Sequence, residues 1–209
     1  MSQARVLVVV ETVAGEARPA ALELFGAGRP LADRLGGDLV ALVAGSGVQA
    51  VAGLAGTLGA DRILVADDPA LAEPVVARVA RAVETALAAA DPELVLLPAT
   101  TLGRDLAPLL AGRFRAAHLV NCTRIQLEDQ AVVATRPVYQ DKLLTTVRAP
   151  RGRRIFITAR SGAFPVPEPQ PGRQVSIEPL AVSFTEADQA VTVTRLVEKP
   201  KGQTNLESA

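Results

Sequence analysis

Hydrophobic residues in this chain are concentrated in short runs that are separated by segments of helix length. The first run, Val6–Val10, contains only Val and Leu, which is typical of a strand buried on both faces. Similar runs follow at Asp38–Val43, Arg62–Ala66 and Leu94–Leu97. Strands that alternate with helices at roughly thirty-residue spacing predict a mainly parallel, doubly wound sheet with helices on both faces, which is a three-layer α/β fold.

The segments between these runs carry helix signals. Helices are predicted over 19–35, 48–58 and 69–90, and Gly36 is a typical residue for the end of the first one. Pro30 lies inside the first helix and predicts a kink or a break there.

The pattern changes after residue 121, where short runs typical of an antiparallel meander begin. Glu128–Gln130 is predicted to be the hairpin turn between the first two of these strands. The meander either packs on the sheet or continues it. Its predicted strands are Cys122–Leu127, Ala131–Arg136, Leu143–Val147 and Arg154–Thr158.

An extended arm is predicted after the meander. Phe164–Gly172 contains four prolines and is expected to form an extended strap, because proline is excluded from helix interiors and central strands. Val175–Phe184 and Val191–Val197 alternate as edge strands do, and the polar tail Glu198–Ala209 is expected to be mobile. The predicted organisation is an α/β domain over 1–164 and an arm over 165–209.

Composition excludes several classes of function. The 22 basic and 22 acidic residues balance, and the chain has five Phe, one Tyr and no Trp, so neither the basic patch nor the aromatic platforms of nucleic-acid binding are expected. No apolar segment approaches the ~20 residues of a membrane span. The lone Cys122 permits no disulfide within the chain, which fits a cytoplasmic protein.

No catalytic or metal-binding group is predicted. His118 is the sole histidine, and no cysteine or carboxylate pattern is spaced to share a metal with it. Cys122 has no activating histidine nearby in the sequence and is expected to be a small buried residue. The chain also lacks a Gly-x-Gly-x-x-Gly segment after its first strand and a Gly-Lys-Ser/Thr loop.

The candidate site is the turn after Leu94–Leu97, which contains Thr100, Gly103, Arg104 and Asp105. Pro108 fits comfortably only in a first helical turn, so the helix is predicted to begin near Gly103–Asp105. A strand end followed by a helix start forms the crevice where open α/β sheets bind ligands or partners. Asp105 in the first turn would favour a self-capped helix over an anion site.

Six ordered segments resemble the N-terminal domain of the electron transfer flavoprotein alpha subunit. The resemblance implies a heterodimer with a homologous beta subunit, which accepts electrons from acyl-CoA or related dehydrogenases and passes them to a quinone oxidoreductase or similar acceptor. The segments are the first strand with Glu11, Arg18–Ala20, Asp67–Ala72, Gly103–Pro108, Thr135–Tyr139 and Ser161–Phe164.

The resemblance also implies where the cofactor is held. In that family FAD sits mainly in a C-terminal domain introduced by a Gly-rich turn. Leu206–Ala209 resembles the segment before that turn, so this chain alone is expected to hold no FAD. A flavin domain encoded separately is one expectation, and a truncated chain or a domain that works alone are the others.

The resemblance suggests roles for Arg136 and Tyr139. Both, with the Arg104–Asp105 turn, are expected to face the beta subunit or a flavin held on a neighbouring domain. Arg136 would supply positive charge and Tyr139 an aromatic wall. The alternative is that Arg136-Pro137 ends a strand and Tyr139 fills the core.

A different function also fits the predicted fold. The order of strands and helices is shared with nucleotide-binding α/β modules of the universal-stress or adenine-nucleotide hydrolase type, which would use the turn at Thr100 and Gly103 for ribose and phosphate. The missing Gly-rich phosphate loop disfavours this alternative.

Overall fold

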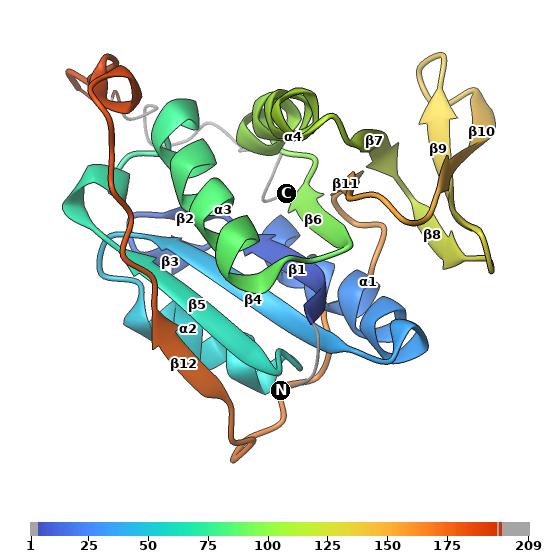
Figure 1. Ribbon diagram of the computed structural model, residues 1–209, viewed down its shortest axis with the longest axis horizontal. Coiled ribbons are helices and arrows are strands. Elements are labelled where there is room, and N and C mark those ends of the chain that lie inside the picture. Colours follow the sequence, from blue (N-terminus) through green and yellow to red (C-terminus); the bar gives the residue numbers. More distant parts are fainter. Residues whose placement is uncertain (1–3, 196, 198–209) are drawn as a thin grey trace, which may run out of the picture.

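The computed structural model describes residues 4–195 and 197. Its middle layer is a seven-stranded sheet in the order β12-β5-β4-β1-β6-β11-β7, in which every pair is parallel (Figure 1). The predicted parallel α/β fold is therefore confirmed. In sheet order the strands are Ser176–Pro179 (β12), Arg62–Asp67 (β5), Asp38–Gly45 (β4), Ala4–Val10 (β1), Leu94–Pro98 (β6), Ile155–Ala159 (β11) and Ala117–Cys122 (β7).

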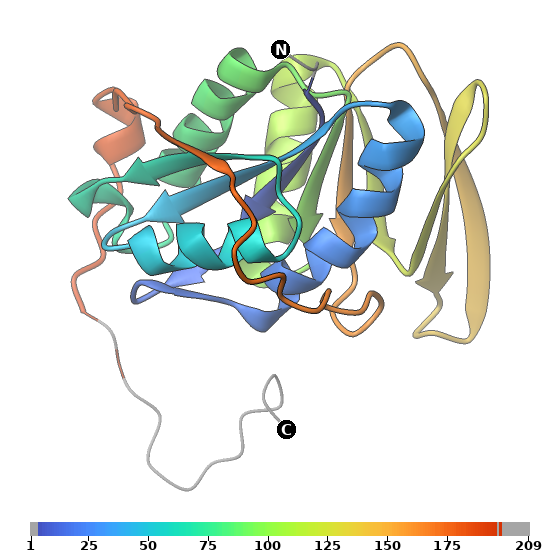
Figure 2. The ribbon, with the colours of Figure 1, turned by 90° about the horizontal axis from the view of Figure 1, so that it is seen from below.

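Four helices cover the two faces of this sheet (Figure 2). Pro19–Leu35 (α1) and Gln49–Thr57 (α2) pack on one face, and Val76–Ala90 (α3) and Thr101–Phe114 (α4) pack on the other. Along β1, Val6, Val8 and Val10 face the first helix layer, and Leu7 and Val9 face the second. Burial on both faces explains why the strand is a continuous apolar run.

A kink or a break was predicted at Pro30, and the break is wrong, because α1 continues through this residue to Leu35. A proline inside a helix removes one backbone hydrogen bond. Here Phe25 and Leu31 are buried on either side of the proline, and Pro30 itself is exposed. Burial of the apolar face on the sheet outweighs the lost hydrogen bond.

The third helix begins later than predicted. Pro69–Leu71 forms a separate short 3-10 turn (η1), in which the Asp68 carboxylate accepts a hydrogen bond from the Ala70 N–H at 2.8 Å. Val75 is extended, and α3 starts at Val76. Pro74 disfavours helical backbone at the preceding residue, Glu73, which favours an interruption between η1 and α3.

The fourth helix begins earlier than predicted. It starts at Thr101, and Pro108 lies in its interior. The assumption that Pro108 marks the first turn was wrong because buried Leu106 and Leu110 hold the helix on the sheet on both sides of the proline.

The predicted antiparallel meander is present beside the main sheet. Arg124–Leu127 (β8), Ala131–Val138 (β9) and Leu143–Pro150 (β10) form a three-stranded sheet in the order β10-β9-β8. The predicted turn at Glu128–Gln130 is confirmed by mutual backbone hydrogen bonds between Glu128 and Ala131. The predicted strand at Arg154–Thr158 corresponds to β11, which continues the parallel sheet rather than the meander.

The arm after residue 164 crosses to the opposite edge of the main sheet (Figure 1). It adds β12 beside β5, so the strand predicted over Val175–Phe184 is confirmed only for Ser176–Pro179. Residues 191–195 have no regular structure, so the strand predicted at Val191–Val197 is wrong there. The tail Glu198–Ala209, with its predicted mobility, lies outside the described residues.

Two short strands, Thr12–Val13 (β2) and Glu16–Ala17 (β3), form a hairpin after β1.

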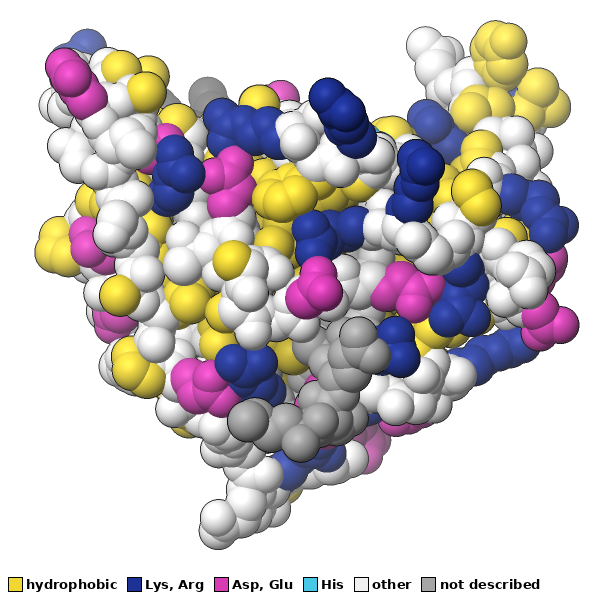
Figure 3. Space-filling view, viewed as in Figure 1, with side chains coloured by type: hydrophobic (Ala, Val, Ile, Leu, Met, Phe, Trp, Pro, Cys, Tyr) yellow, Lys and Arg dark blue, Asp and Glu magenta, His cyan; other side chains and the backbone are white. Residues whose placement is uncertain are grey.

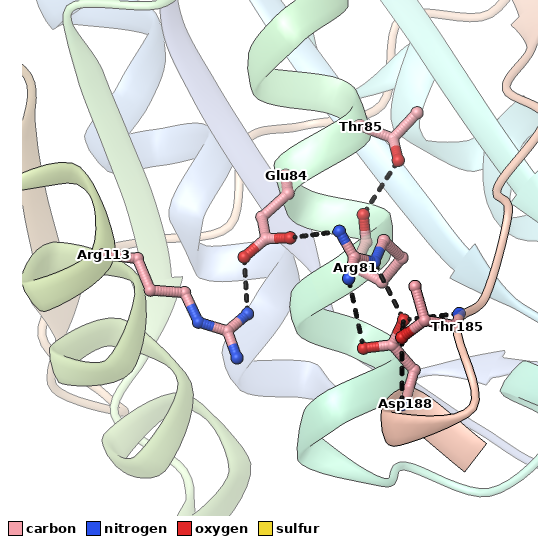
Figure 4. A network of polar contacts seen from close by, with 6 residues as sticks. All are labelled: Arg81, Glu84, Thr85, Arg113, Thr185 and Asp188. Atoms are coloured by element: carbon pink, nitrogen blue, oxygen red, sulfur yellow. Dashed lines mark hydrogen bonds and ion pairs between the residues drawn. The ribbon is translucent and has the colours of Figure 1, made fainter.

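A polar cluster fastens the arm to the helices (Figure 4). Asp188, in the 3-10 turn Ala187–Gln189 (η2), accepts hydrogen bonds from Arg81 Nε at 2.9 Å and from the Thr185 hydroxyl and N–H at 2.8 Å each. Arg81 also pairs with Glu84 at 3.0 Å, and Glu84 pairs with Arg113 of α4 at 2.5 Å. Burial alone would raise the pKa of Asp188, but the hydrogen bonds outweigh it and lower the pKa to about 2.

Candidate functional site

The order of the strands places a crevice between β1 and β6. The chain runs from β1 to β4 and β5 on one side, and then crosses to β6 on the other side. Ligands of open α/β sheets bind at the carboxyl ends of the strands at such a switch point. Glu11 follows β1 there and Thr100 follows β6, so these two residues define the crevice.

Thr100 joins the two sides of the crevice. Its hydroxyl accepts a hydrogen bond from the Gly103 N–H at 3.1 Å, which caps α4, and donates one to Glu11 Oε2 at 2.5 Å. Glu11 is only 7% exposed, and its other carboxylate oxygen lies 3.5 Å from Arg18 Nε. The Glu11 charge is therefore balanced inside the protein rather than left for a ligand.

The predicted self-capping by Asp105 is wrong. The first turn of α4 contains no acidic residue, because the helix starts at Thr101 and Asp105 falls in its second turn. Thr100 is the cap instead, as its position immediately before the helix allows. Asp105 and Arg104 are both exposed, and Arg104 Nε lies 3.3 Å from the Thr100 carbonyl oxygen.

Gly103 brings the helix close to the end of β6. A Cβ atom at this position would lie 1.9 Å from the Pro98 carbonyl oxygen, which is far inside van der Waals contact. Only glycine permits this approach. Among the predicted site residues of the turn, Thr100 and Gly103 thus hold the crevice together, whereas Arg104 and Asp105 face outward.

Side chains fill the crevice itself. The cavity at this position has a volume of about 20 Å³, whereas small-molecule sites usually measure about 300 Å³ or more. A flavin or a nucleotide does not fit among these residues, which counts against the universal-stress alternative as well. The lining comes from several segments and includes Thr12, Leu71, Pro74, Leu102 and Leu106.

Arg136 and Tyr139 lie away from the crevice, on the β9–β10 hairpin. Tyr139 is 76% exposed, so the alternative in which it fills the core is wrong. Arg136 does not end the strand, because β9 continues through Pro137 to Val138. Pro137 lies beyond the last residue paired with β8, where β9 has a partner on one side only and a missing N–H is tolerated.

Arg136 is half-buried, and its Nε has no hydrogen-bond acceptor among the described residues. Burial lowers the pKa of nearby His118, and the positive charge of Arg136 lowers it further. Burial raises the pKa of Cys122 to about 12, which Arg136 only partly opposes. Cys122 is fully buried, as expected, and its thiol stays protonated at neutral pH.

An ion pair fastens the tip of this hairpin to the main sheet. Arg160, directly after β11, donates hydrogen bonds to both carboxylate oxygens of Asp141 at 2.7 and 2.6 Å. These hydrogen bonds lower the pKa of Asp141. Tyr139, Gln140 and Asp141 have φ values of 52°, 54° and 66°, a left-handed backbone that side-chain-bearing residues rarely adopt. Asp141, the partner of Arg160, thus lies within this left-handed segment.

Three regions near the segments that carry the resemblance come together at the carboxyl ends of the strands: the turn after β6, the end of β11 and the β9–β10 hairpin. The Ala99 N–H donates to the Ala159 carbonyl at 2.8 Å, which joins the turn to the end of β11. The Asp141–Arg160 pair then joins β11 to the hairpin. Neither this pair nor the Glu11–Thr100 hydrogen bond was predicted from the sequence. The one available signal was a carboxylate, Glu11, directly after a buried strand.

The hairpin also exposes a hydrophobic surface, which we call the hairpin patch. It consists of Tyr139, Leu143 and Leu144, which are 76%, 57% and 70% exposed. Figure 3 shows hydrophobic side chains gathered at this corner, at the upper right of the view. Exposed apolar surfaces of this kind mark interaction sites. Among the described residues no cluster of potential metal ligands occurs, and no helix is long and apolar enough to cross a membrane.

A family model and several curated proteins match most of this chain. Residues 6–185 match the family model described as "Electron transfer flavoprotein domain". The chain is 32% identical over 206 residues to "Protein FixB" of Clostridium saccharobutylicum, covering 98% of this chain and 61% of that protein. It is 30% identical over 209 residues to "Electron transfer flavoprotein subunit alpha" of Clostridium acetobutylicum, covering 98% and 62%.

A third relative has a different name. The chain is 27% identical over 198 residues to "Lactate dehydrogenase (NAD(+),ferredoxin) subunit LctC" of Acetobacterium woodii, covering 94% of this chain and 47% of that protein. The chain thus spans between about half and three fifths of the length of these curated relatives.

Proposed function

We propose that this chain, which belongs to the electron transfer flavoprotein family, is an alpha-subunit-like component of an electron carrier. It acts as a rigid scaffold that binds a beta subunit and a flavin-bearing neighbour, and it is not an enzyme on its own. The observation that carries this proposal is the hairpin patch, which is exposed yet anchored to the carboxyl edge by Asp141 and Arg160.

The cofactor of the assembled complex is proposed to be FAD, as the family name implies a flavin. The residues of the β1–β6 crevice do not fit it, because the cavity there measures about 20 Å³. We propose that FAD is held away from this crevice, either on a further part of a longer subunit or on a separately encoded domain. Thr100 and Gly103 contribute by fixing the turn, not by contacting the flavin.

Arg136, Tyr139, Arg104 and Asp105 are proposed to face the neighbouring protein. Tyr139, Arg104 and Asp105 are exposed, so a partner can reach all three. Arg136 is only half-buried and would supply positive charge beside that protein. The electron donor is proposed to be an acyl-CoA or related dehydrogenase, and the acceptor a quinone oxidoreductase or a similar protein.

Co-expression with the beta subunit encoded in the same genome tests the proposal. Tagged chain is expected to retain that subunit through purification. Leu144→Ser is expected to weaken retention, because Leu144 is 70% exposed and lies in the hairpin patch. Val166→Ser, which changes another exposed apolar side chain (46% exposed) in the arm, is the matched control and should bind normally. Failure of the unmodified chain to retain the beta subunit would contradict the proposal.

A further inference from the structure

A second cavity lies at the amino ends of the central strands, on the side of the molecule opposite the β1–β6 crevice. Its volume is about 550 Å³, which is within the usual range for small-molecule sites. Four segments line it: the start of β1, the α3–β6 loop, the end of α4 and the loop before β11. Figure 3 shows basic side chains around the middle of the face that carries α4 and the start of β6.

The lining of this cavity is rich in arginine. Arg5, Arg115, Arg153 and Arg154 line it, against two acidic residues, Asp91 and Glu93. Both carboxylates are already engaged. Asp91 pairs with Arg154 at 2.7 Å. Glu93 pairs with Arg151 at 2.8 Å and lies 4.0 Å from Arg5.

Three of the lining arginines keep unused donors. Within the described part of the chain, no carboxylate pairs with Arg115 or Arg153, and both side chains are exposed. The Nε of Arg5 is buried and has no hydrogen-bond acceptor there. Arg115 and Arg153 can therefore donate hydrogen bonds to a bound anion. The buried Arg5 Nε is out of reach of an anion, so Arg5 contributes its positive charge.

The remaining groups are already fixed in place. The Arg154 guanidinium lies 5.1 Å from the centre of the Phe114 ring and donates to the Pro92 carbonyl at 3.2 Å. Phe114 is 39% exposed and adds an apolar wall. Arg115 caps α4, with its N–H hydrogen-bonded to Ala111 and Gly112 carbonyls. Fixed backbone positions reduce the entropy lost when a ligand binds.

We propose that this cavity binds a small anion with two or more linked phosphate groups. Arginine matches the oxygen geometry of phosphate with paired hydrogen bonds, and several arginines from separate segments suit a multivalent anion. The cavity also accommodates an organic group against Phe114 beside the phosphates. This site is independent of the proposed electron-transfer role. It lies at the amino ends of the strands, whereas the β1–β6 crevice and the Asp141–Arg160 pair lie at the carboxyl ends.

Calorimetric titration of the full chain with pyrophosphate, with ADP and with citrate tests the site. The double variant Arg115→Gln/Arg153→Gln removes the two unpaired cations. The control Arg34→Gln/Arg124→Gln makes the same charge change at exposed arginines that do not line the cavity. Thermal melting without ligand confirms that both variants fold.

Pyrophosphate and ADP are expected to bind the unmodified chain and the control equally. Binding to the Arg115→Gln/Arg153→Gln variant should be weaker by about tenfold or more, the effect of losing charge-assisted hydrogen bonds. Equal binding by both double variants would overturn the site, as would no binding to the unmodified chain. Citrate binding as tight as that of pyrophosphate would overturn the assignment to phosphate.

Discussion

The β1–β6 crevice and the β9–β10 hairpin occupy the same edge of the molecule but differ in what they offer. The crevice is where an α/β sheet ordinarily binds its ligand, and here it holds a cavity of about 20 Å³ and a buried Glu11–Thr100 hydrogen bond. The hairpin is exposed and apolar, yet Arg160 holds its tip in place. The difference supports the proposal that these carboxyl ends of the strands contact a protein rather than a small molecule.

The largest expected effect on the free energy of unfolding comes from a substitution at Gly103, where α4 packs against the end of β6. Gly103→Ala places a methyl group 1.9 Å from the Pro98 carbonyl oxygen, so α4 must shift. We expect a loss of about 3 kcal/mol in the free energy of unfolding. Gly112→Ala in the same helix has open space around its Cβ position and should gain about 1 kcal/mol. Urea unfolding measures both, and equal effects would show that the crevice is not tightly packed.

The Asp188–Arg81 pair, in which the carboxylate is buried and the arginine is partly exposed, provides a pH-dependent contrast to the exposed Asp141–Arg160 pair. The pKa of Asp188 falls from 3.8 to about 2 on folding, so its stabilisation is complete above about pH 4 and is lost as the pH falls through about 2. Asp188→Asn should reduce the free energy of unfolding at pH 7 by about 2 kcal/mol. The difference from the unmodified chain should shrink toward pH 2. A constant difference across this range in melting experiments would contradict the assignment.

A smaller effect is expected from the crevice hydrogen bond. Thr100→Ala removes the cap of α4 and leaves the buried Glu11 carboxylate without that donor. The expected cost is about 1–2 kcal/mol. Thr101→Ala changes the neighbouring exposed threonine and should leave the melting temperature nearly unchanged. Similar losses for the two variants would argue against Thr100 as the link across the crevice.

The smallest effect on global stability is expected at the hairpin tip. Asp141→Ala removes the ion pair with Arg160 at an exposed position and leaves a non-glycine residue at a φ of 66°. We expect an unchanged melting temperature but faster amide hydrogen exchange at residues 139–142, since only the tip loses its anchor. Asp141→Glu keeps the charge and serves as the control. Unchanged exchange in Asp141→Ala would mean that the tip needs no anchor.

Sequence patterns predicted the buried strands better than the site. β1, β4, β5 and β6 were found because burial on both faces requires continuous apolar runs. β7 was missed because His118 and Asn121 make it half polar at the edge of the sheet. The start of α4 was misplaced because a helix can contain a proline such as Pro108 when the neighbouring residues are buried. The helix propensities of the residues do not include that packing.

The filling of the crevice was not predictable in the same way. The crevice is lined by η1, the start of α4 and the end of β1. These segments are far apart in the sequence, so no local sequence pattern predicts that they contact one another. The sequence left two roles open for Tyr139, and only its 76% exposure decides between the core and the surface. The resemblance singled out the turn after β6 and the hairpin, but their contact through Ala159 and Arg160 could be seen only in the fold.

Flavin retention tests the central claim most directly. The purified chain is mixed with FAD, desalted and examined for flavin absorbance, alone and after co-expression with the beta subunit and a flavin-domain protein. The account predicts that the chain alone retains no FAD when excess ADP is present to occupy the arginine-lined cavity, because its β1–β6 crevice measures only about 20 Å³. It also predicts that the chain co-purifies with the yellow complex. Stoichiometric FAD on the chain alone would contradict it.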